Sequence, residues 1–170
     1  VSGAMIPAVN EYSLPRFQRL QQQHKDWKLL FALGLHPCFV TTAVKDQLKQ
    51  VQQQFSQLPI HAIGESGLDK TQPHWTQQIQ ALEQHLQWAE QYNLPIILHH
   101  RRSMNELFAI VKQYPRVKGV IHAFSGSLQQ ARQWIELGYY LGIGGTITYP
   151  RAKKTRQSVL EIDLKYLLLE

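Results

Sequence analysis

The chain has 170 residues, of which 44% are hydrophobic and 18% charged, a balance typical of a folded globular domain rather than a disordered chain. No apolar run approaches the roughly 20 residues of a membrane-spanning helix, and Cys38 is the only cysteine, which excludes an internal disulfide. We therefore expect a cytoplasmic protein without membrane association, whose formal net charge of +6 is compatible with nucleic-acid binding but also common without it.

Short apolar runs alternate with amphipathic stretches along the whole chain. The sequence predicts strands, in chain order, at residues 3–9, 29–35, 60–64, 95–99, 119–123, 139–143 and 166–169. It predicts helices between them at 13–24, 42–55, 75–89, 103–113, 127–137 and 153–160. Ser103 and Ser127 are placed to cap two of these helices. His24, His74 and His85 lie on or beside helices, where we expect them to face solvent.

Regular alternation of strand and helix predicts a parallel sheet, because parallel neighbours in a sheet need a crossover between them. The predicted strands are continuously apolar, as expected when helices cover one face of the sheet and packed side chains fill the other. Two architectures fit this pattern, an open doubly wound sheet and a closed barrel. No stretch resembles a linker, so we expect residues 1–170 to form a single domain.

Polar residues recur where the predicted strands finish. Glu65 follows the third strand, His99 ends the fourth and His122 lies at the end of the fifth. In a parallel barrel these strand ends open on one face, so we expect the three side chains to converge there. Two imidazoles and a carboxylate suit a divalent ion, which lowers the pKa of a bound water and so supports hydrolysis near neutral pH. A single histidine at a strand end is usually an ordinary loop residue, and the prediction depends on three such residues on consecutive strands.

Five ordered motifs resemble the TatD family of metal-dependent deoxyribonucleases, in particular its YjjV-type branch. They are GLHP at 34–37, AIGESGLD at 62–69, LPIILHHR at 94–101, GVIHAFSG at 119–126 and YLGIGGTITYPRA at 140–152. The resemblance covers essentially the whole chain. It implies a TIM-type (β/α) barrel that hydrolyses DNA or another phosphodiester substrate with one or two divalent cations, zinc, manganese or magnesium. By this resemblance Glu65, His99 and His122 match the family's metal ligands, and His36 and Arg101 match motif positions beside the site, which we assign to substrate binding.

The chain also departs from the family pattern. The family's first strand ends in a His-x-His pair and its last strand in Glu-Thr-Asp, whose Asp binds metal, and neither feature is found in this sequence. We therefore expect an incomplete barrel, without the first strand and the C-terminal helix region, and weak or absent activity of the chain by itself. Two other hypotheses stay open. One is a non-catalytic barrel that binds nucleic acid or a protein partner, and the other is a related barrel hydrolase that acts on small esters or amides.

Overall fold

Seven parallel strands form one sheet in the computed structural model, which describes residues 3–10 and 12–170. The strand order is β1-β2-β3-β4-β5-β6-β7, so each strand pairs with its neighbours in the chain. The strands are β1 (Gly3–Pro7), β2 (Lys28–Leu33), β3 (Ala62–Asp69), β4 (Ile96–Arg101), β5 (Gly119–Ile121), β6 (Tyr139–Ile143) and β7 (Leu167–Leu169). The helices are α1 (Leu14–Gln23), α2 (Val44–Gln53), α3 (Trp75–Tyr92), α4 (Met104–Val111), α5 (Leu128–Glu136) and α6 (Lys153–Leu160). Short 3-10 helices are η1 (Pro37–Phe39), η2 (Gln54–Ser56), η3 (Gly145–Thr148) and η4 (Leu164–Tyr166).

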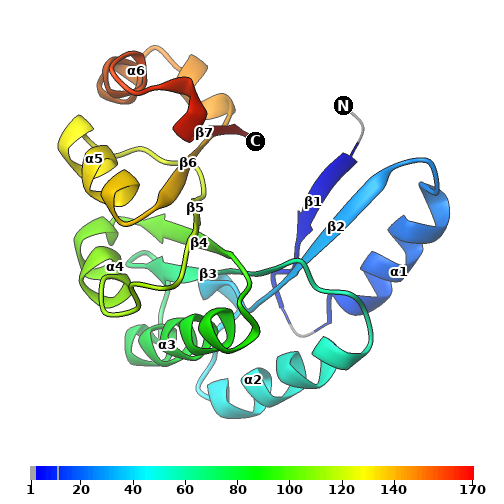
Figure 1. Cartoon of the computed structure of the whole chain (residues 1–170). Coiled ribbons are helices and arrows are strands. Elements are labelled where there is room, and N and C mark those ends of the chain that lie inside the picture. Colours follow the sequence, from blue (N-terminus) through cyan, green and yellow to red (C-terminus); the bar gives the residue numbers. More distant parts are fainter. Residues whose placement is uncertain (1–2, 11) are drawn as a thin grey trace.

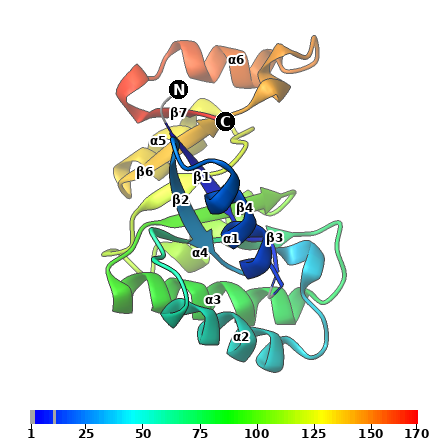
Figure 2. The same cartoon turned by 90° about the vertical axis from the view of Figure 1, so that its right-hand side faces the viewer.

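The helices lie on the outer side of a curled sheet, and β1 and β7 are its two edges (Figure 1). The view from the side shows the same arrangement, with the helices around the strands (Figure 2). A doubly wound sheet reverses its strand order at a switch point and carries helices on both faces. Neither feature occurs in the described segments, so the barrel is the correct one of the two predicted architectures. The fold is an open, seven-stranded (β/α) arrangement of the TIM-barrel type.

The predicted strands and helices correspond to the observed ones, and the main difference is the extent of β3. The sequence predicts a strand at 60–64, but β3 runs on to Asp69 and all 8 of its residues are buried. The segment after Gly64 looks like a loop because it is polar and contains Gly67. A Cβ at position 67 would lie 2.0 Å from the His99 carbonyl oxygen, so β3 can pair with β4 here only because residue 67 has no side chain. Glu65 therefore lies inside a strand rather than after one.

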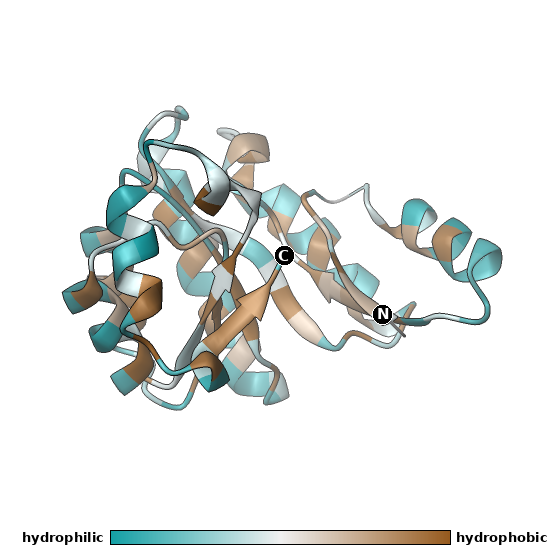
Figure 3. Cartoon of the chain, turned by 90° about the horizontal axis from the view of Figure 1, so that it is seen from above, coloured by the Kyte–Doolittle hydropathy of each residue, from teal (hydrophilic) through white to brown (hydrophobic). Residues whose placement is uncertain are grey.

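The apolar faces of the helices pack against the sheet, and their hydrophilic faces point outward (Figure 3). In α3, the buried side chains include Leu82, Leu86 and Ala89, which lie on the apolar face of the amphipathic helix that the sequence predicts at 75–89. Burial of each leucine contributes about 1.5–3 kcal/mol, which holds α3 against β3. Among the helices of the described segments, none combines the length and the hydropathy that crossing a bilayer requires.

His85 is buried in the core, which corrects the prediction that it faces solvent. Its exposed fraction is 0%, and its Nε2 accepts a hydrogen bond from the Leu35 amide at 3.0 Å. Its Nδ1 donates to the Ala81 carbonyl at 2.6 Å. Because both ring nitrogens have partners, the ring can be buried without leaving a polar atom unsatisfied. His24 is exposed, as predicted, whereas His74 is half-buried.

The two predicted helix caps have different outcomes. Ser127 accepts a hydrogen bond from the Gln130 amide, and the Gln130 side chain accepts one from the Ser127 amide, so α5 begins with a capping box. Ser103 occupies the N-cap position of α4, as predicted, but its side chain makes no capping hydrogen bond. Its hydroxyl instead donates to the Leu68 carbonyl at 2.6 Å, which ties the start of α4 to β3.

Candidate functional site

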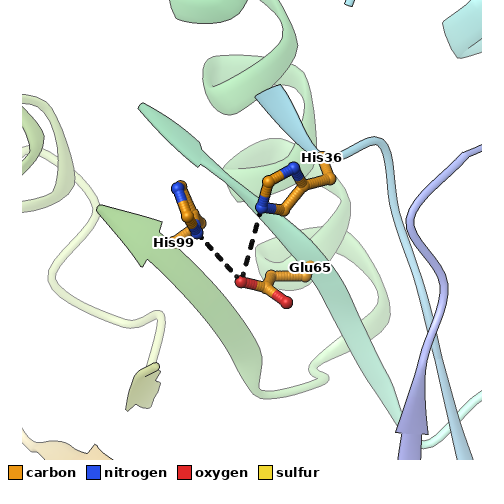
Figure 4. Close-up of side chains that lie close together, drawn as sticks. All are labelled: His36, Glu65 and His99. Atoms are coloured by element: carbon orange, nitrogen blue, oxygen red, sulfur yellow. Dashed lines mark hydrogen bonds and ion pairs between the residues drawn. The ribbon is translucent and has the colours of Figure 1, made fainter. Parts of the chain in front are cut away.

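Side chains from four neighbouring strands meet at the C-terminal edge of the sheet. His36 follows β2 and precedes η1, Glu65 lies in β3, His99 lies in β4, and His122 directly follows β5. Figure 4 shows His36 and His99 with one ring nitrogen of each directed toward the same carboxylate oxygen of Glu65. The parallel pairing of β2 to β5 brings together residues that are far apart in the sequence.

One oxygen of Glu65 is the centre of this cluster. Glu65 Oε1 lies 3.2 Å from Nδ1 of His99 and 3.7 Å from Nε2 of His36. Nε2 of His122 lies 3.9 Å from the same oxygen. Glu65 is only 6% exposed, and the rings of His36 and His99 are in edge contact with their centroids 4.2 Å apart. Three imidazoles thus surround one buried carboxylate oxygen.

Burial and charge favour an ionised Glu65 beside a neutral His36 ring. Burial by itself would raise the pKa of the Glu65 carboxyl, but the hydrogen bond with His99 and the charges of the neighbouring histidines lower this pKa below its usual value. Burial, followed by the charge of His99, lowers the pKa of His36 to about 4. At neutral pH the site therefore presents an anionic carboxylate, which is the protonation state that a metal ion requires of a carboxylate ligand, and a neutral His36 ring beside it.

Two further carboxylates lie behind the histidine rings. Asp69 Oδ2 is 3.6 Å from Nε2 of His99, and both atoms are buried without a hydrogen-bond partner among the described residues. Glu170 Oε1 is 3.0 Å from Nδ1 of His122, and this hydrogen bond raises the pKa of the ring. His99 and His122 thus each direct one ring nitrogen toward Glu65 and the other toward a second carboxylate.

The donor atoms fit a divalent cation. Ligand atoms of Glu65 and His99 lie within 4.8 Å of each other and of a ring nitrogen of His36, so the cluster has the spacing of a site for one ion. Imidazole nitrogen and carboxylate oxygen are ordinary ligands of zinc and other borderline divalent metals. His36 also has another role, because its Nδ1 accepts a hydrogen bond from the Cys38 amide at 3.1 Å. The proton of the neutral His36 ring is therefore on Nε2, the nitrogen that faces Glu65.

Four of the five residues singled out in the sequence come together. Glu65, His99 and His122 lie at one edge of the sheet, and His36 joins them. Arg101 ends β4 and is exposed beside the cluster rather than inside it.

Asp69 and Glu170 were not among the site residues predicted from the sequence. Asp69 lies at the end of a recognised motif, but only the extended β3 shows that it faces His99. Glu170 directly follows the three leucines of β7, and an acidic residue after an apolar strand is the same signal that singled out Glu65. That signal was present in the sequence, whereas the link from Glu170 to His122 depends on the pairing of β5, β6 and β7.

Comparisons of the sequence and of the structure with known proteins indicate the same family. A family model described as TatD related DNase matches residues 1–170. YjjV of Escherichia coli (strain K12), an uncharacterized metal-dependent hydrolase, is 41% identical over 176 residues, which cover 100% of this chain and 67% of that protein. The crystal structure of the E. coli protein, a TatD homolog, matches with a TM-score of 0.88 at 40% identity and the same coverage. Deoxyribonuclease Tat-D of Schizosaccharomyces pombe is 36% identical over 115 residues, which cover 64% of this chain and 36% of that protein.

Proposed function

Because this chain belongs to the family of TatD-related DNases, we propose that its cluster of histidines and carboxylates is the metal centre of a hydrolase that cleaves the phosphodiester bonds of DNA. The observation that carries the proposal is the convergence of three imidazole nitrogens on Glu65 Oε1, at 3.2 to 3.9 Å. Burying an ionised carboxylate costs stability unless it has partners, so a fold that only bound DNA or a protein would gain nothing from this cluster. The chain spans 67% of its E. coli relative, so activity and substrate are proposed here rather than carried over.

Glu65, His99 and His122 are the proposed metal ligands. The mixed nitrogen and oxygen set suits zinc or manganese, and magnesium is the third candidate because carboxylates also bind it. The second oxygen of Glu65 allows a second ion, as in sites where one carboxylate bridges two metals. When bound, the metal supplies Lewis-acid chemistry, which lowers the pKa of water and stabilises negative charge on the phosphate. His36 is excluded from this set because its Nδ1 accepts the Cys38 amide, which keeps the ring proton on Nε2. The ring proton of His99 can instead move to Nε2, which faces Asp69, and so leave Nδ1 free for a metal.

His36 and Arg101 are the proposed substrate-binding residues. The Nε2 proton of His36 can donate a hydrogen bond to a phosphate oxygen once the substrate lies beside Glu65. The exposed guanidinium of Arg101, at the end of β4, matches the geometry of a phosphate group. The formal net charge of +6 further favours the approach of a polyanion.

Calorimetric titration with manganese chloride tests the ligand set. We expect binding by the wild-type chain and by His24→Ala, a control that removes an exposed histidine at the end of α1. We expect no comparable binding by Glu65→Gln or His122→Ala. A wild-type chain that takes up no metal, or four proteins that bind alike, would contradict the proposal.

A second experiment tests the substrate. Labelled single- and double-stranded DNA and a small ester are incubated with the metal-loaded chain and with Glu65→Gln. DNA cleavage that requires both metal and Glu65 supports the proposal, even at a low rate. DNA binding without metal uptake would instead favour a non-catalytic barrel, and hydrolysis of the ester without action on DNA would favour a related barrel hydrolase.

A further inference from the structure

A carboxylate outside the proposed ligand set holds His122 in place. We propose that Glu170 is a positioning residue that fixes the tautomer and the orientation of His122, so that the lone pair on Nε2 faces Glu65. The consequence for metal binding rests on the proposed function, whereas the tautomer itself can be measured without metal.

The two oxygens of Glu170 make separate hydrogen bonds. Oε1 lies 3.0 Å from Nδ1 of His122, and Oε2 accepts a hydrogen bond from the Ala123 amide at 2.9 Å. Two bonds to consecutive residues fix both the position and the rotation of the carboxylate group. The Glu170 side chain is 21% exposed, so the pair is partly shielded from water. An isolated pair on the open surface would have neither the second bond nor this shielding.

The backbone of β6 and β7 brings Glu170 to this position. The Glu170 amide donates to the Ile143 carbonyl at 3.2 Å, which continues the pairing of β7 with β6. The carboxylate then lies over Gly142, where an added Cβ would be 1.8 Å from Glu170 Oε1. The carboxylate can occupy this place because residue 142 has no side chain.

The hydrogen bond to Glu170 determines which nitrogen of His122 is protonated. A neutral imidazole carries one ring proton, and a carboxylate can only accept a hydrogen bond. Nδ1 of His122 therefore holds the proton, and the lone pair is on Nε2, 3.9 Å from Glu65 Oε1. Free histidine prefers the opposite tautomer, so the protein must impose this one. A carboxylate that acts on the far nitrogen is the usual way in which proteins orient a metal-binding histidine.

His36 provides the contrast that makes the role of Glu170 specific. Nε2 of His36 lies slightly nearer to Glu65 Oε1, at 3.7 Å, than does Nε2 of His122. Its Nδ1, however, accepts the Cys38 amide, so its Nε2 carries a proton and has no lone pair to offer. The hydrogen-bond partner of Nδ1 thus determines which ring can bind metal. This partner is an amide donor for His36 and a carboxylate acceptor for His122. The distance from Nε2 to Glu65 Oε1 alone would favour His36 over His122.

Long-range proton–nitrogen NMR spectra of the metal-free chain, recorded at an alkaline pH where the rings are neutral, test this proposal. We expect His122 to carry its proton on Nδ1 in the wild type and largely on Nε2 in Glu170→Ala. We expect the same variant to bind manganese about 10- to 100-fold more weakly. Glu161→Ala, which removes an equal charge from an exposed position after α6, is the matched control and should change neither result.

Gly142→Ala is a second variant, which retains Glu170 but places a methyl group where the carboxylate lies. It displaces only the end of a flexible side chain, so the fold is kept, and we expect the same tautomer change as in Glu170→Ala. The proposal is overturned if wild-type His122 carries its proton on Nε2, or if both variants leave the wild-type tautomer unchanged. A wild-type protein with the expected tautomer that takes up no manganese would retain the role of Glu170 and reject the metal centre instead.

Discussion

Acidification is expected to destabilise the fold through His85, whose ring is 0% exposed in α3. Burial lowers the pKa of His85 from 6.5 to about 4 in the folded chain. Because the folded-state pKa is the lower one, the unfolded chain takes up the proton first, and stability falls as the pH decreases. The contribution of the neutral ring is present above about pH 6.5 and is lost as the pH falls toward about 4. Between about pH 7 and about pH 5 the loss amounts to about 2 kcal/mol.

Urea unfolding of the wild type and of His85→Gln at these two pH values isolates this effect. A glutamine can still accept the Leu35 amide and donate to the Ala81 carbonyl, but it does not titrate. His36 and His100 also have lowered pKa values, but both remain in the variant, so their effect cancels in the comparison. The free energy of unfolding of the wild type should fall by about 2 kcal/mol more than that of His85→Gln. Equal losses in the two proteins would refute the reasoning.

Two further substitutions test the environment of His99 and a helix cap. Nδ1 of His99 donates to Glu65 in the metal-free chain, so a metal at Nδ1 requires the ring proton to move to Nε2, which faces Asp69 Oδ2 at 3.6 Å. In Asp69→Asn, the oxygen that accepts from Thr71 can be kept, so the new amide group faces Nε2 and holds the proton on Nδ1. Calorimetry should show that Asp69→Asn binds manganese at least about 10-fold more weakly than the wild type. The control Asp26→Asn, at an exposed position, should bind manganese as the wild type does. Equal affinities of Asp69→Asn and the wild type would show that Asp69 does not orient His99. Ser127→Ala removes the capping box of α5 and should lower the free energy of unfolding by about 1 kcal/mol, measured by urea unfolding. An unchanged midpoint would mean that the cap contributes nothing.

The fold was predictable because strand–helix alternation is a local property of the sequence. Apolar runs and helical periodicity located every strand and helix to within a few residues, and the exception was β3. Its second half contains two polar residues and Gly67, a composition that favours a loop. The segment becomes a strand because it pairs with β4, and this long-range contact leaves no periodic pattern in the sequence. The alternation alone did not decide between barrel and doubly wound sheet. The resemblance to the TatD family implied the barrel, and the strand order confirms it.

The proposed metal ligands could be predicted because the C-terminal ends of the strands in a parallel sheet lie along one edge. This rule brought together Glu65, His99 and His122 without knowledge of the coordinates. It did not distinguish the environment of each ring, because the placement of nearby carboxylates such as Asp69 and Glu170 depends on register and side-chain direction. His85 was misjudged for a related reason. A polar residue in a helix is usually solvated, and its burial requires backbone partners at both nitrogens that the sequence does not disclose.

The proposed metal centre can be observed directly by anomalous diffraction from crystals of this chain grown with manganese. The account predicts an anomalous peak in contact with one oxygen of Glu65, Nδ1 of His99 and Nε2 of His122, at about 2.0–2.2 Å from each. His36 should lie beside the ion without bonding to it. A peak bound by His36 in place of His122, or no peak at Glu65 under saturating manganese, would contradict the account.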